Sequence, residues 1–161
     1  MPRLHRLTPA LALVSGLLLW AGLAQGRTVT DPIRLDQIRV QLLLERTGEL
    51  SPNVAPPATT TLWNTVIGEG DAGQPATDAL VWVSLRSATA EANAPRPLSV
   101  TVRGRGGRIL ARRVFEAVLI TGGRAARAVL VPEAGCAGPV AIEAAYGAQR
   151  LTSRVNFACS E

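Results

Sequence analysis

The chain has 161 residues, of which 47% are apolar, 18% charged and 4% aromatic, and its formal net charge is +5. This is the length of one domain and enough apolar material for a core, which excludes a disordered chain. All 17 cationic side chains are Arg, and the only His and the only Met are His5 and Met1. We expect the stretch that holds both to be removed. A mature chain without imidazole or thioether groups excludes Ser-His-Asp and Cys-His catalysis, His-bound zinc or copper, and haem held by His or Met.

The N-terminus has the three parts of a secretory signal peptide. Residues 1–6 are basic, residues 7–23 carry no charge, and small residues follow. We predict a signal peptide over residues 1–24, with cleavage after Ala24 or, in the alternative, after Gly26. An uncleaved N-terminal membrane anchor is the competing interpretation. The uncharged run is short for such an anchor, because a membrane-spanning helix needs about 20 apolar residues.

Removal of the signal peptide lowers the net charge. Without Arg3 and Arg6, 15 Arg stand against 12 carboxylates, a net charge of +3. That charge is too small to predict nucleic-acid binding. We therefore expect a periplasmic or secreted protein with no cofactor, no nucleic-acid partner and no membrane span in its mature part.

After an extended segment over residues 25–37, we expect residues 38–161 to form one domain of eight or nine short strands. The strands are expected at residues 38–44, 59–67, 79–86, 98–103, 108–115, 118–120 and 126–131, followed by a terminal hairpin. Short strands separated by Gly- and Pro-rich turns predict an all-β, antiparallel β-sandwich of immunoglobulin-like architecture.

Two details of this strand assignment need separate mention. Residues 38–44 alternate with a period of two, but Asp31-Pro32 before them and Gly48 after them are also helix signals, so a helix is the alternative. Trp63 and Trp82 lie among apolar neighbours in the middle of predicted strands. We expect both in the core.

Both cysteines fall in the terminal hairpin. Gly147-Ala148 has the Gly-first pattern of a two-residue type II′ turn, which pairs Tyr146 with Gln149. The same register places Cys136 opposite Cys159, with apolar residues on one face of the hairpin and charged residues on the other. We predict a disulfide between the two cysteines. The alternative, a redox-active pair, requires a closer spacing.

Arginines gather around the Gly-rich turn at residues 104–107. Guanidinium groups fork onto phosphate or sulfate, so the cluster is a candidate site for an envelope polyanion such as lipopolysaccharide or an acidic polysaccharide. Its members are Arg103, Arg105, Arg108, Arg112 and Arg113, and Arg124 and Arg127 follow soon after. The alternative is a solvated hairpin face. Another envelope protein is the other partner considered.

The loop over residues 68–78 holds Glu69, Asp71 and Asp78. These carboxylates are candidate calcium ligands or an acid/base pair of the glycosidase type, although their spacing differs from that of an EF-hand. The alternative is a polar loop without a site. Because the mature chain lacks His, a reactive Cys and a nucleophile elbow, we favour a non-enzymatic binding or structural module over a carboxylate-dependent hydrolase.

Overall fold

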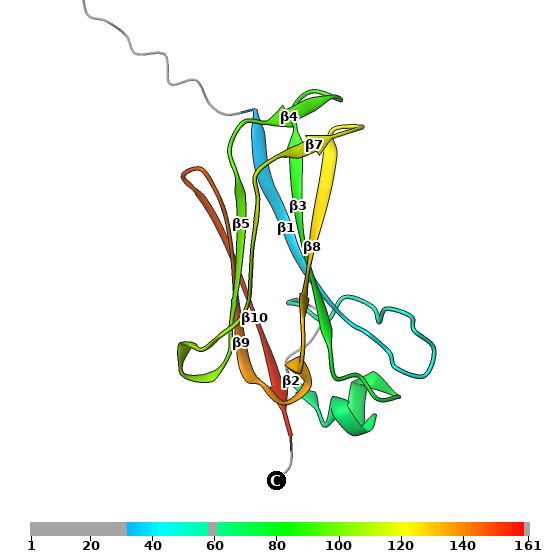
Figure 1. The fold of residues 1–161 in the computed structure, drawn as a ribbon. Helices are drawn as coiled ribbons and strands as arrows, with labels where there is room; N and C mark the ends of the chain where they lie inside the picture. Colours follow the sequence, from blue (N-terminus) through cyan, green and yellow to red (C-terminus); the bar gives the residue numbers. More distant parts are fainter. Residues whose placement is uncertain (1–31, 58–60, 160–161) are drawn as a thin grey trace, which may run out of the picture. The chain divides into compact units, whose positions relative to one another are not determined.

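The computed structural model describes residues 32–57 and 61–159 (Figure 1). The predicted signal peptide and its cleavage site lie outside the described residues. In the described part, every regular element is a strand or a single 3₁₀ turn, which confirms an all-β chain with antiparallel sheets. No helix in this part is long and apolar enough to cross a membrane.

The described strands number ten. They are β1 (Ile33–Leu42), β2 (Thr61–Trp63), β3 (Ala79–Ser87), β4 (Ala92–Ala94), β5 (Leu98–Arg103), β6 (Ile109–Phe115), β7 (Val118–Ile120), β8 (Arg124–Val131), β9 (Gly138–Tyr146) and β10 (Gln149–Ala158). The 3₁₀ turns are η1 (Thr65–Ile67), η2 (Gly70–Ala72), η3 (Arg105–Gly107) and η4 (Ala134–Cys136).

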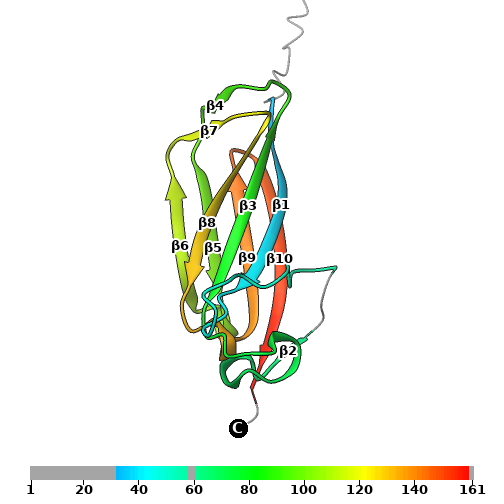
Figure 2. The ribbon, with the colours of Figure 1, turned by 90° about the vertical axis from the view of Figure 1, so that its right-hand side faces the viewer.

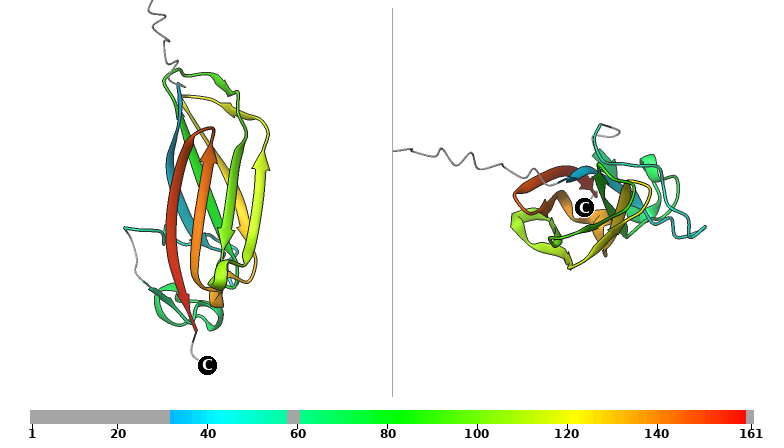
Figure 3. Two further views of the ribbon diagram at one scale, coloured as in Figure 1. Left: turned by 90° about the vertical axis from the view of Figure 1, so that its left-hand side faces the viewer. Right: turned by 90° about the horizontal axis from the view of Figure 1, so that it is seen from above.

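Three sheets form, with strand orders β1-β3-β8, β2-β10-β9-β5-β6 and β4-β7. The two larger sheets lie face to face, the first in front in Figure 2 and the second in front in the left view of Figure 3. Their facing sides supply the core. Alternate residues of β3, β5 and β9 are buried there, among them Val81, Val83, Val100, Val102, Ile142 and Ala144. The residues between them point outward, which leaves two outer faces.

Strand β1 begins at Ile33 rather than at residue 38, and the helix alternative is excluded. Its register with β3 shifts between Leu35 and Gln37, so that Asp36 forms a β-bulge. The extra residue interrupts the alternation of apolar and polar residues. For this reason the first half of the strand was not recognised from the sequence. Apolar residues on both sides of the bulge still face the core.

The prediction that Trp63 and Trp82 lie in the core is wrong. β2 pairs in parallel with the end of β10, which turns Leu62 inward and leaves Trp63 48% exposed. In β3 burial alternates along the strand, so Trp82 points outward, where the guanidinium carbon of Arg39 lies 5.9 Å from its ring centroid. The near-continuous apolar run of β3 concealed this alternation, because its outward residues are partly apolar as well.

One predicted strand is shorter than expected, and one predicted loop contains a strand. Strand 59–67 ends at Trp63, because Asn64 takes the left-handed conformation with φ 46° and ψ 40° and leads into η1. The loop over residues 87–97 includes β4, which pairs with β7. These short elements raise the number of strands above the eight or nine predicted.

The terminal hairpin and its disulfide are confirmed. Every pair between β9 and β10 has the predicted register, from Tyr146 opposite Gln149 onward. Gly147 takes a φ of +56°, which a type II′ turn requires at its first central residue. Cys136 and Cys159 are joined, with their Cα atoms 5.5 Å apart.

Candidate functional site

The arginine cluster of the sequence is divided by the fold. Arg112 and Arg113 are neighbours in β6, so their side chains leave opposite faces of the sheet. Arg113 shares the inward side with Phe115, and its guanidinium carbon lies 6.0 Å from that ring. Arg105 and Arg108 lie in the turn between β5 and β6, within η3 and directly after it.

Arg103 and Arg112 instead join arginines from the terminal hairpin on the outer face of the five-stranded sheet. The pairing of β6, β5, β9 and β10 aligns their outward residues in rows. One row runs Arg112, Thr101, Glu143, Thr152, and the next runs Arg103, Ala141, Arg154. A third row holds Ser99, Ala145 and Arg150. We call the residues of these three rows the basic face.

The basic face has four arginines and one carboxylate, Glu143. Arg150 comes nearest to it, with its Nε atom 3.6 Å from Oε1 of Glu143, and both side chains are about half exposed. A contact of this kind in open solvent contributes little to stability. Arg103 also donates a hydrogen bond to the carbonyl of Gly107, and Arg150 to those of Gly147 and Gln149. All four arginines are exposed, and a guanidinium group has five N–H donors, so each keeps donors for an external anion.

The side chains in the middle of the basic face are short. Thr, Ser and Ala occupy the positions between the arginines, and a hollow of about 640 Å³ lies there. It is lined by residues of β5, β9 and β10 from both sides of the sheet, among them Thr101, Ala141 and Ile142, and by Gln37, Ile38 and Pro56. Short side chains between guanidinium groups leave room for an extended anionic chain to lie across the strands.

Trp63 lies at the end of the same sheet. Trp63 pairs with Ala158 of β10. Ala158 follows the outward residue Asn156 by two positions, so Ala158 and Trp63 also face outward. An exposed indole offers a flat surface on which a sugar ring or another apolar plane can stack. The structure thus adds an aromatic group to the outer side on which the basic face lies.

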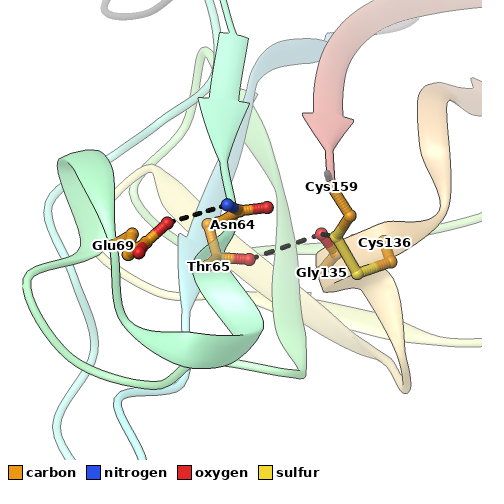
Figure 4. The surroundings of a disulfide bond; sticks show 6 residues. All are labelled: Asn64, Thr65, Glu69, Gly135, Cys136 and Cys159. Carbon is orange, nitrogen blue, oxygen red and sulfur yellow. Dashed lines mark hydrogen bonds between the residues drawn. A yellow bond between two sulfur atoms is a disulfide. The ribbon is translucent and has the colours of Figure 1, made fainter. Parts of the chain in front are cut away.

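The carboxylates of the 68–78 loop have structural partners in the described residues. An Oε2 atom of Glu69 accepts a hydrogen bond of 2.8 Å from Nδ2 of Asn64, as Figure 4 shows. Oδ1 of Asp78 accepts one of 3.0 Å from the backbone N–H of Glu133. The side chain of Asp71 lies outside what the structure describes. In the described part, no three Asp, Glu, His or Cys side chains gather as metal ligands would.

Comparisons with known proteins give no family. No family model matches the chain, and no curated protein matches its sequence. Among solved structures, the C-terminal domain of wzt is similar over 82% of this chain and 75% of that chain, with 8% sequence identity and a TM-score of 0.40. At that score the likeness assigns neither a family nor a function.

Arg150, Arg154 and Trp63 were not among the residues predicted to bind a ligand. The signal for the two arginines was present, since the hairpin register already placed them on its charged face. What the sequence lacked was the pairing of β5 with β9, which brings Arg103 beside them. For Trp63, no local pattern indicated that it points outward.

Proposed function

We propose that the chain is an exported, non-enzymatic β-sandwich protein that binds a polyanionic component of the cell envelope. Residues 1–24 serve as its signal peptide, and one domain of immunoglobulin-like architecture follows, which includes all of β1. The face-to-face packing of the two larger sheets supports this architecture. The disulfide Cys136–Cys159 supports an oxidising compartment, because disulfides persist in the periplasm and outside the cell.

The arrangement of the basic face carries the proposal. Four arginines from β5, β6 and β10 share this face with a single carboxylate, and two of them, Arg103 and Arg154, line the hollow. Guanidinium groups at several positions match the repeated anionic groups of a polymer better than a single small ligand. Two of the loop carboxylates, Glu69 and Asp78, accept hydrogen bonds from Asn64 and Glu133, which supports a binding role over hydrolysis.

The test is binding of heparin and of lipopolysaccharide to the double variant R112Q/R154Q. Its two substitutions lie on opposite sides of the basic face. We expect the affinity to fall by at least about tenfold, since each charged hydrogen-bond partner contributes about 1.5–3 kcal/mol. The melting temperature should stay nearly unchanged, because exposed charges contribute little to stability. R112K/R154K should restore only part of the affinity, because Lys cannot form the bidentate fork.

The matched control is R46Q/R127Q, which removes the same charge away from the basic face. Arg46 lies in an exposed loop, and Arg127 pairs with Val83 on the inward side of β8. Wild-type binding should weaken steeply with added salt, as expected when anionic groups release counterions. Equal losses in both double variants, or no loss in R112Q/R154Q, would refute the assignment of this face.

A further inference from the structure

The outer face of the other large sheet has a second concentration of arginines. Arg34 lies directly opposite Arg86, and Arg86 lies directly opposite Arg124, across β1, β3 and β8. Like charges at directly opposed positions of a sheet destabilise it. Such a row in a folded domain therefore indicates either nearby counter-charges or a site for an anion.

The counter-charge on this face is incomplete. Asp36, at the β1 bulge, places Oδ1 3.1 Å from Nη2 of Arg86. It is the only carboxylate among the outward residues of these three strands. Within the residues that the structure describes, neither Arg34 nor Arg124 forms an ion pair. Only the central arginine of the row is neutralised.

A separate hollow of about 390 Å³ lies beside this row. It is bounded by Arg124 on β8 and Arg39 on β1, with Gln37, Ser84 and Ala126 between them. Asp36, whose carboxylate pairs with Arg86, also lines it. Ser and Ala leave space between the two guanidinium groups, while the Ser hydroxyl and the Gln amide provide further hydrogen-bond donors. This volume is at the lower end of the range for small-molecule sites.

Arg39 lies next to an aromatic side chain. Its guanidinium carbon lies 5.9 Å from the centroid of the Trp82 ring, a cation–π contact that restricts the side chain. An arginine positioned in this way loses less conformational freedom when it binds an anion. The contact also places Trp82 close enough to Arg39 to report on binding.

We propose that Arg39 and Arg124 form a second anion site, which takes a phosphate or sulfate group carried on a small organic residue. The two guanidinium groups approach the anion from opposite sides, and Ser84 and Gln37 donate to its remaining oxygens. The site does not rest on the proposed function, because neither of its arginines belongs to the basic face; Gln37 lines both hollows and is left unchanged in the variants tested. Either of the two proposed sites can be refuted without refuting the other.

The test uses the fluorescence of Trp82. In the exported chain, W63F leaves Trp82 as the only tryptophan, since Trp20 lies in the predicted signal peptide. The W63F protein is titrated with glucose 6-phosphate, glucose 6-sulfate, inorganic phosphate and, as a neutral control, glucose. We expect a saturable change in emission with the charged sugars and none with glucose. Equal affinity for inorganic phosphate would assign the site to the free ion.

R124Q in the W63F background should weaken binding by at least about tenfold, in keeping with the loss of a charge-assisted hydrogen-bond partner. R154Q removes the same charge from the basic face and should leave the affinity within about twofold, since Arg154 does not line this hollow and interactions between exposed charges are screened by salt. Melting temperatures check that both variants are folded. No saturable response to any of the anions, or equal weakening by R154Q, would overturn the proposal. Heparin binding to R112Q/R154Q is measured separately and tests only the proposed function.

Discussion

At the scale of single residues, Gly135 is closely packed beside the disulfide (Figure 4). A Cβ atom on Gly135 would lie 2.7 Å from Cγ2 of Val66 and 2.9 Å from Oγ1 of Thr65. Thr65 is fully buried and donates a hydrogen bond of 3.5 Å to the carbonyl of Gly135. We expect G135A to lower the free energy of unfolding by about 1–3 kcal/mol, the usual cost of overpacking, as measured by urea denaturation.

A second substitution separates this clash from a backbone effect. V66A removes the nearest methyl group, so the double variant V66A/G135A should recover part of the stability that G135A loses. G48A measures the cost of a positive φ (+73°) alone, because its Cβ would meet nothing within 4 Å; Gly135 does not have a positive φ, so its loss is attributed to the clash. If G135A were as stable as the wild type, the link between η1 and η4 would not depend on this close approach.

At the scale of elements, the β9–β10 hairpin and its disulfide join the C-terminal strand to η4. The cysteines are separated by 23 positions, and a loop of that length predicts about 3 kcal/mol of stabilisation through the unfolded chain. C136S/C159S should lose that amount in urea denaturation. The wild type should lose as much after reduction, and the double variant should not respond to the reductant. Free thiols or an intermolecular bridge in non-reducing mass analysis would contradict the pairing.

At the scale of the whole domain, the packing of two sheets face to face gives each an outer side that carries arginines. The basic face and the Arg39–Arg124 site therefore point in opposite directions, and neither draws its arginines from one continuous segment of chain. This arrangement explains why a modest net charge of +3 on the predicted mature chain is compatible with two local anion sites. Local charge, rather than the total, governs what each face can bind.

Export is tested on the intact protein. Mass spectrometry of the protein from its native source should find an N-terminus at Gln25 or at Arg27, as cleavage after a small residue requires. The protein should be recovered without detergent. Recovery of a chain that still carries Met1 in the membrane fraction would show that residues 7–23 act as an anchor instead.

The sequence by itself determined the features that depend on neighbours along the chain. A two-residue turn sets the register of its own hairpin, so residues 146–149 were sufficient to predict the disulfide and the charged face of β9 and β10. Residues 98–103 were likewise predicted as a strand, and β5 spans the same residues. The all-β character followed from the same local patterns.

Only the tertiary structure decided which separate segments meet. The pairing of β5 with β9 assembles the basic face, and the pairing of β1 with β3 and β8 aligns Arg34, Arg86 and Arg124. The exposure of Trp63 likewise depends on its parallel pairing with β10. No local signal encodes these pairings, because the register between distant strands is selected by how well their apolar sides pack together in the core.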